Sequence, residues 1–118
     1  MHYVDGFVVP VKKAKLASYR RLARKMAAVC KEYGALEYVE CVADDVKPGK
    51  LTSFPQSVKL KRDETVVFAY VVYRSRTHRD QVNAKIMKDP RFANMDRSKM
   101  PFDGKRMFWG GFKQIVAL

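Results

Sequence analysis

Hydrophobic runs with the composition of β-strands recur along the chain. Tyr3 to Val11 and Thr65 to Tyr73 are rich in the β-branched and aromatic residues that favour strands. Leu36 to Asp45 and Arg106 to Val116 predict two further strands. The last of these contains Gly110-Gly111, which indicates a bulge or a close backbone approach.

Two other stretches carry hydrophobic residues at the three- and four-residue steps of an amphipathic helix. The first, Ala14 to Tyr33, places an apolar stripe opposite a basic face, and Gly34 directly after it suits a left-handed cap. The second, Thr77 to Asp89, begins with Thr77 and Asp80 at the spacing of a helix start. Pro90 predicts that this helix ends at the preceding residue.

The predicted elements follow the order β-α-β-β-α-β. This order is typical of the ferredoxin-like split β-α-β arrangement, an α+β fold with a four-stranded antiparallel sheet and two helices on one face. The chain of 118 residues has the length of one domain, and we expect residues 1–118 to form it. Pro48-Gly49 predicts a type II turn. Residues 54–62 fit a short strand or a helical turn, and residues 91–99 are ambiguous.

The strands predict that both faces of the sheet are buried. A face open to water should show polar residues in alternation with apolar ones. The strand Thr65 to Tyr73 instead presents Val67, Ala69, Val71 and Tyr73 on one side and Phe68, Tyr70 and Val72 on the other. Two helices cover only one face. A second copy of the chain is the simplest cover for the other, because two-fold dimers are the commonest oligomers, so we expect a homodimer.

Basic residues outnumber acidic ones by 24 to 12, which gives a formal net charge of +12. Such a charge attracts polyanions without specificity. RNA-recognition modules share the predicted order of elements, but their third strand needs a glycine and a basic lead-in. The run Val66 to Tyr73 has neither. We therefore expect nucleic-acid contact only through nonspecific charge.

Several other classes of protein are disfavoured. Met1 to Val11 lacks the regions of a signal peptide, and no hydrophobic run approaches the roughly 20 residues of a membrane span. Cys30 and Cys41 form no C-x-x-C motif, and we interpret both as inert core thiols in a reducing cytoplasm; the alternative is a disulfide between them. His2 and His78 have no partner at ligand spacing, so we predict neither a metal site nor a cofactor.

Several motifs resemble the YbaA-like family of small bacterial proteins. They are Tyr3-Val-Asp-Gly-Phe-Val8, Gly34-Ala-Leu36, Val39-Glu-Cys41, Met100-Pro-Phe-Asp-Gly-Lys-Arg-Met107 and Gly110-Gly-Phe112. The resemblance runs nearly from end to end, and the Met100 to Met107 motif is specific. It implies a dimeric α+β barrel, the fold shared by antibiotic-biosynthesis-type monooxygenases, muconolactone isomerases and stress-responsive barrels. It implies no activity and no catalytic residue.

Two acidic residues are candidates for acid–base catalysis. Asp5 shares a strand face with Tyr3 and Phe7, and Glu40 shares one with Tyr38. A carboxylate among such side chains is desolvated, which raises its pKa into the range of a general base. The alternative for each is an ion pair with a lysine or arginine. If Asp5 and Glu40 lie on adjacent strands and on one face, they form a carboxylate pair.

Five further residues are candidates for substrate binding. Asp103, Lys105 and Arg106 surround a tight turn and are able to hold a small anion or carboxylate. Alternatively, their charges are solvated or hold the loop to the body of the protein. Tyr70 and Trp109 fit a pocket for a flat aromatic molecule, or else they fill the core or a dimer interface.

Three functional hypotheses follow from these features. The first is a dimeric barrel that binds or transforms a small aromatic or carboxylated molecule in a pocket between sheet and helices. The second is nonspecific binding of nucleic acid or another polyanion through the basic surface. The third is a scaffold dimer without catalysis.

Overall fold

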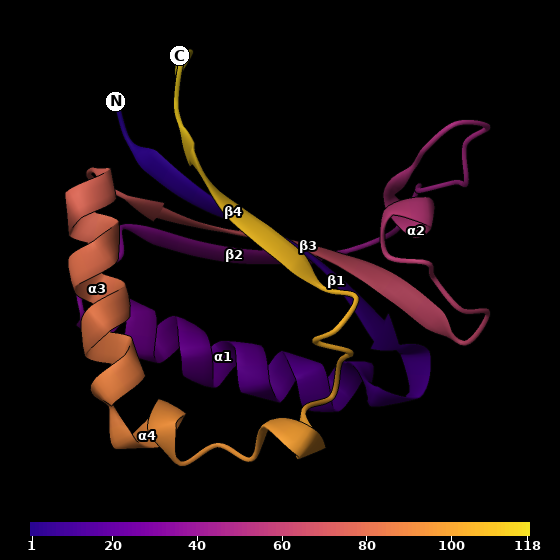
Figure 1. Cartoon of the computed structure of the whole chain (residues 1–118), viewed down its shortest axis with the longest axis horizontal. Coiled ribbons are helices and arrows are strands. Elements are labelled where there is room, and N and C mark those ends of the chain that lie inside the picture. Colours follow the sequence, from indigo (N-terminus) through magenta and orange to yellow (C-terminus); the bar gives the residue numbers. More distant parts are fainter.

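Four antiparallel strands form the sheet of this protein, for which a computed structural model describes all residues from 1 to 118. They are β1 (Tyr3–Lys12), β2 (Glu37–Val42), β3 (Glu64–Tyr73) and β4 (Phe108–Lys113). Their order across the sheet is β2-β3-β1-β4 (Figure 1). Each hydrogen-bonded pair is antiparallel. The predicted ferredoxin-like α+β fold is thereby confirmed.

Except for α2 (Phe54–Ser57), whose Phe54 packs on Phe68 of the other face, the helices lie on one side of this sheet (Figure 1). The two long ones are α1 (Leu16–Glu32) and α3 (Arg76–Lys88), and α1 follows the short helix η1 (Lys13–Lys15). After α3 come α4 (Pro90–Ala93) and η2 (Arg97–Lys99). The segment from α4 to β4 runs below α1 before it returns to the sheet (Figure 1). None of the helices combines the length and apolar character that a bilayer crossing requires.

The helix boundaries follow local capping chemistry. Gly34 has a φ of 109°, the left-handed conformation that its position after α1 predicts. The start of α3 was predicted at Thr77, but Ser75 is the capping residue, since its hydroxyl accepts a hydrogen bond from the backbone N–H of His78. Asp89 likewise caps α4. At the predicted break, α3 ends at Lys88 and α4 begins at Pro90, so only Asp89 separates the two helices.

Two ambiguous stretches and one turn are resolved by the structure. Residues 54–62 contain the one-turn helix α2 (Phe54–Ser57), which is capped by Ser53. Residues 91–99 contain most of α4 and the whole of η2. The type II turn predicted at Pro48-Gly49 is wrong, because Gly34 is the only glycine with a positive φ and such a turn needs one at Gly49.

The strand register decides which side chains face the helices. Asp5 in β1 lies opposite Val71 in β3, and Phe7 lies opposite Ala69. On the other side of β3, Glu40 in β2 also lies opposite Ala69. Asp5 and Glu40 therefore share the helix-covered face, but β3 separates their strands, and they do not meet the condition for a carboxylate pair.

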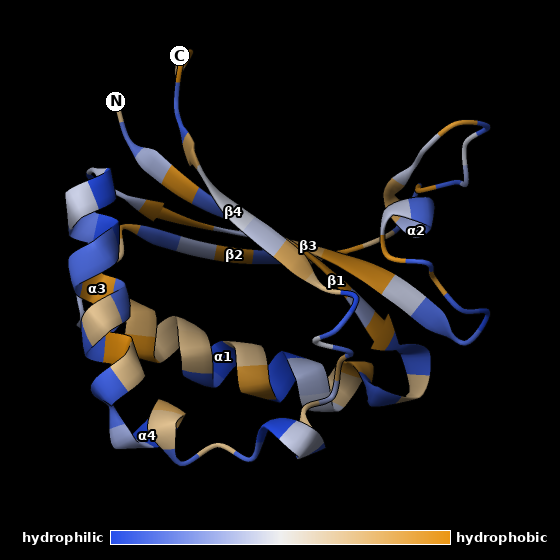
Figure 2. Ribbon diagram, in the orientation of Figure 1, coloured by the Kyte–Doolittle hydropathy of each residue, from blue (hydrophilic) through white to orange (hydrophobic).

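The hydrophobic core fills the space between the sheet and the helices. Val29 and Cys30 of α1 pack there with Val71 of β3 and with Val82 and Ile86 of α3. Figure 2 shows hydrophobic residues along the strands and at intervals on α1. The opposite face of the sheet is covered by its own chain only at one end, where Val58 packs on Val8 and Val66 and Phe54 packs on Phe68. It exposes 44% of Phe68, 46% of Phe108 and 63% of Phe112.

Candidate functional site

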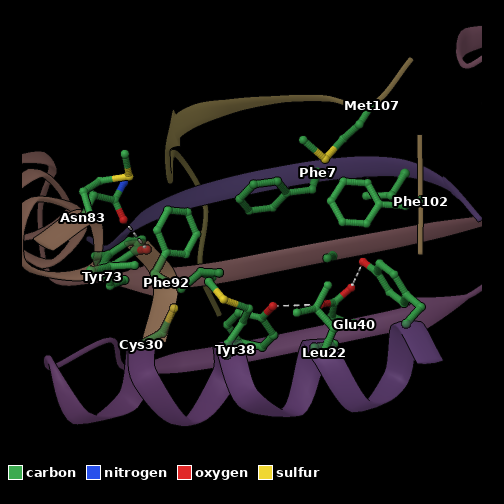
Figure 3. A pocket seen from close by; sticks show the side chains of 18 residues that line it. Phe7, Leu22, Cys30, Tyr38, Glu40, Tyr73, Asn83, Phe92, Phe102 and Met107 are labelled. Carbon is green, nitrogen blue, oxygen red and sulfur yellow. Dashed lines mark hydrogen bonds between the residues drawn. The ribbon is translucent and has the colours of Figure 1, made fainter. Parts of the chain in front are cut away.

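A cavity of about 270 Å³ lies between the helix-covered face of the sheet, α1, α3 and the segment before β4. Its 18 lining residues are hydrophobic or aromatic except Glu40 and Asn83. Phe92 and Phe102 contribute from the segment between α3 and β4 (Figure 3). Such a lining, with only two polar side chains, is the usual composition of a small-molecule site.

Glu40 is the only charged group in the wall of the cavity. The hydroxyl of Tyr38 donates to its Oε2 at 2.7 Å, and the hydroxyl of Tyr19 donates to its Oε1 (Figure 3). Burial, together with the nearby carboxylate, raises the pKa of both tyrosines well above the ordinary value. Both hydroxyls therefore stay protonated at neutral pH and remain hydrogen-bond donors.

The local sequence explains why these three side chains meet. Tyr38 and Glu40 are two residues apart on β2, so they project from the same face of the strand. The residue opposite Glu40 is Ala69, whose small side chain leaves space beside the carboxylate. Tyr19 reaches the same point from the buried side of α1. Neither tyrosine was a predicted site residue, although strand alternation already placed Tyr38 on the same face as Glu40.

Asp5 lies outside the cavity lining and is only 2% exposed. Its Oδ1 is 3.7 Å from Nε of Arg79, and neither atom has a hydrogen-bond partner. Burial raises the pKa of Asp5, whereas the Arg79 charge and a hydrogen bond from Asn83 act in the opposite direction. Asp5 thus sits behind the wall of the cavity in a buried ion pair with α3.

Arg79 also joins α3 to the start of β1. Its Nη2 donates to the hydroxyl of Tyr3 at 3.1 Å, and its guanidinium lies over the Tyr3 ring at 5.1 Å. Gly111 makes room for this arrangement, because a Cβ there would lie 2.3 Å from the Tyr3 hydroxyl oxygen and 2.8 Å from Nη2 of Arg79. The predicted close approach at the glycine pair is confirmed at Gly111.

Two charged residues of the Met100 to Met107 loop, Asp103 and Arg106, form ion pairs. Arg106 Nη2 lies 2.6 Å from Oε2 of Glu64, and Arg106 Nε lies 2.8 Å from Oδ2 of Asp103. These hydrogen bonds hold the pKa of both carboxyls below its usual value. Asp103 and Arg106 therefore fasten the loop to the start of β3. Lys105 is exposed and forms no ion pair.

The two aromatic candidates lie on different faces of the sheet. Tyr70 is in β3 on the open face, away from the cavity. Trp109 is on the helix-covered side, where it stacks on Phe7 with ring centroids 5.9 Å apart and remains 53% exposed. Phe7 lines the cavity and Trp109 does not. Trp109 thus supports the cavity wall from behind.

The two cysteines have different environments. Cys30 is buried and lines the cavity, and burial raises the pKa of its thiol to about 11. The thiol is therefore protonated at neutral pH and a poor nucleophile. Cys41 was predicted to be a core residue, but it is exposed in the single chain, because it lies opposite Phe68 on the open face of the sheet.

Comparison with known proteins adds the family. Residues 2–104 match the model of the family described as "Protein of unknown function (DUF1428)". The chain belongs to this family. It is 51% identical over 116 residues to the "Uncharacterized protein YbaA" of Escherichia coli strain K12 and to that of Shigella flexneri, with 98% of each chain covered. The resemblance seen in the sequence motifs is confirmed.

Solved structures of low sequence identity share the fold. A dimeric ferredoxin-like protein from an uncultured marine organism superposes with a TM-score of 0.61 at 12% identity, with 100% of both chains covered. A NIPSNAP domain protein from Burkholderia xenovorans superposes with a TM-score of 0.56 at 9% identity, covering 97% of this chain and 95% of that one. At these identities the likeness concerns the fold alone.

Proposed function

We propose that this protein binds a small, neutral and largely apolar molecule in the cavity beside Glu40. The observation that carries the proposal is the single carboxylate, held by the hydroxyls of Tyr19 and Tyr38, in an otherwise apolar wall. Aromatic side chains such as Phe7 and Phe92 offer flat surfaces to the ligand. The volume of about 270 Å³ is just below the usual range of roughly 300–1,000 Å³ for ligand pockets, so the ligand is small.

Glu40 defines the polar group that such a ligand should carry. Each oxygen of a carboxylate accepts more than one hydrogen bond, so acceptor capacity remains after Tyr19 and Tyr38 have donated. A hydroxyl or N–H group of the ligand satisfies it. A carboxylated ligand is disfavoured here, because two carboxylates in an apolar cavity repel each other at short range.

The same carboxylate is suited to take a proton from the ligand. A general base needs to lie within hydrogen-bond reach of the proton that it removes, and a donor group bound to Glu40 meets this condition. Tyr19 and Tyr38 would stabilise the carboxylate before the transfer and hold its orientation. We assign the acid–base role to Glu40 rather than to Asp5, since Asp5 is paired with Arg79 outside the cavity lining.

A matched pair of probes tests this proposal. We expect 2-naphthol to bind at least about tenfold more tightly than 2-naphthoate, measured by NMR titration, because only the first donates to Glu40 without charge repulsion. Glu40→Gln should remove most of this preference. Glu37→Gln, an exposed change on the same strand, serves as the control. Equal binding of both probes, unaffected by Glu40→Gln, would contradict the proposal.

We further propose that two copies associate through the open face of the sheet. Phe68, Phe108 and Phe112 are exposed there, and Lys12, at the end of β1, is the only lysine or arginine of the four strands that faces this side. An apolar patch of this kind is typical of a protein interface. The assembly of the marine ferredoxin-like protein, which its description calls dimeric, supports this arrangement.

The second candidate function is nonspecific binding of nucleic acid, which would use the basic surface of the protein. The net charge of +12 favours it, but the open face of the sheet carries only Lys12 to hold phosphates beside bases stacked on its aromatic side chains. Binding of this kind should fall steeply as salt is added. The two unpaired cysteines suit a reducing compartment such as the cytoplasm, where we propose that the protein works.

A further inference from the structure

A second cavity, of about 450 Å³, lies on the outer side of the Met100 to Met107 loop. We call it the cationic groove. Its walls come from the end of β1, from η1, from the turn before β3, from η2 and from the loop itself. The charged residues in these walls are Lys12, Lys15, Lys61, Arg97, Lys105, Arg106, Glu64 and Asp103.

The ion pairs of the groove leave its lysines uncompensated. Arg106 holds both acidic residues, Glu64 and Asp103, with three hydrogen bonds of 2.6 to 2.8 Å. Its remaining donor interactions go to the carbonyl oxygens of Val58 and Lys59. The four lysines of the groove form no ion pair with any carboxylate of the chain.

The four lysines reach the groove from three different parts of the chain. Lys12 and Lys15 are close in sequence, whereas Lys61 precedes β3 and Lys105 precedes β4. Like charges gathered around one hollow repel one another, and of the four lysines only Lys61 is also attracted by the Glu64 and Asp103 carboxylates. The guanidinium of Arg97 is directed toward the ring of Phe92, 5.5 Å from its centroid, so we place Arg97 at the rim.

We propose that the cationic groove binds a small multivalent anion of the phosphate class, such as a phosphorylated or pyrophosphorylated metabolite. Ammonium groups bind phosphate oxygens as point charges that need no fixed planar geometry. Several of them around one hollow favour a ligand with several negative charges over a single carboxylate. The site is separate from the apolar cavity, because Phe102 lies in the wall between the two and Glu40 is not part of the groove.

A hollow lined from several segments favours a compact anion over a nucleic-acid duplex, which would follow an extended basic surface. The adjoining groove beside α1 contains Arg21, Lys25 and Lys99, but Asp96 also lines it and pairs with Lys99 at 4.0 Å. Binding should therefore concentrate at Lys61 and Lys105 rather than spread evenly over the 24 basic residues of the chain.

Titration with inorganic tripolyphosphate tests the proposal. We expect saturable calorimetric binding by the full chain, and chemical-shift changes centred on the amides of Gly104 and Lys105. The double substitution Lys61→Ala and Lys105→Ala should weaken binding at least about tenfold, since two of the four uncompensated charges are lost. Binding of 2-naphthol should be unchanged, which separates this site from the apolar cavity.

The matched control is the double substitution Lys47→Ala and Lys50→Ala. It removes the same charge from two exposed lysines outside the groove. An equal loss of affinity in both double variants would overturn the proposal in favour of net charge alone. The proposal would also be overturned in favour of a general polyanion surface if duplex DNA bound more tightly than tripolyphosphate and lost the same affinity in both double variants. Circular dichroism and the retained naphthol binding show that each variant is folded.

Discussion

The hydroxyl of Tyr38 lies 2.7 Å from Oε2 of Glu40, and both side chains face the apolar cavity. The two residues are separated by one position on β2, so the hydrogen bond depends only on the alternation of a strand. Its importance comes from the surroundings. A carboxyl group in an apolar wall needs hydrogen-bond donors, and Glu40 receives two.

Removal of one donor should therefore destabilise the protein. We expect Tyr38→Phe to lower the free energy of unfolding by about 2 kcal/mol, the usual contribution of a hydrogen bond to a charged group. Urea denaturation measures the change. Tyr70→Phe is the control, because Tyr70 lies on the open face and its hydroxyl forms no hydrogen bond within the chain. Equal effects of both substitutions would mean that the Tyr38 hydroxyl does not support Glu40.

The glycine pair in β4 provides a sharp steric comparison. Gly111→Ala should destabilise the fold by about 1–3 kcal/mol, because its Cβ would lie 2.3 Å from the Tyr3 hydroxyl oxygen and would displace Arg79. Gly110→Ala should be nearly neutral, since the nearest atom to its Cβ would be a Phe112 ring carbon at 3.7 Å. Thermal unfolding of the two variants distinguishes them. Similar melting temperatures would show that Tyr3 and Arg79 move aside freely.

Loss of Arg79 should make the stability more dependent on pH. Arg79→Met leaves the Asp5 carboxylate buried without its counter-charge, and we expect a loss of about 3 kcal/mol at pH 7. Burial already raises the folded-state pKa of Asp5, and this substitution raises it further. A carboxyl whose pKa is higher in the folded state favours folding as the pH falls.

The difference in free energy of unfolding between the unsubstituted protein and Arg79→Met should therefore become smaller as the pH falls from 7 toward about 4, near the ordinary pKa of an aspartate. Denaturation curves at several pH values measure it, with Asp5→Asn in the same background as the control for the titrating group. A deficit that stays constant over this range would exclude Asp5 as the cause.

The cluster around Arg106 should show the opposite dependence on pH. Arg106 holds the pKa of Glu64 and of Asp103 below their usual values of 4.5 and 3.8. Such depressed values stabilise the fold above the unfolded-state pKa, and the stabilisation is lost as the pH falls through and below that range. Arg106→Gln should accordingly cost stability at pH 7 and much less near pH 3. Lys99→Gln, which breaks an exposed pair with Asp96, should change stability by less than about 0.5 kcal/mol.

The open face of the sheet predicts the oligomeric state. Phe112→Glu should convert a dimer to a monomer, because it places a charge in the apolar patch. Light scattering at low and high salt measures the molar mass. Leu51→Glu, at a residue that is 96% exposed outside the sheet, should leave the dimer intact. A wild-type protein that is monomeric at both salt concentrations would refute the proposed association.

Part of the site was accessible from the sequence. Glu40 was identified because it alternates with apolar residues along a strand, and the structure places it in the cavity wall. Asp5 was identified by the same pattern, but this pattern could not distinguish a cavity-lining acid from one paired with Arg79 behind the wall. Asp103 and Arg106 were predicted to hold an anion, but Arg106 is paired with Glu64 instead. The sequence did not reveal this ion pair, because Glu64 is remote from the loop along the chain.

The sequence alone determined the order of strands and helices, since the two- and three-to-four-residue periods are local consequences of backbone geometry. It therefore determined the ferredoxin-like fold, and its motifs determined the family. The tertiary structure decided which residues meet: Glu64 and Arg106, 42 positions apart, and Tyr19 and Glu40, 21 positions apart. Contacts of this kind depend on strand register and helix placement, which are fixed by packing of the whole core and leave no periodic signal in the sequence.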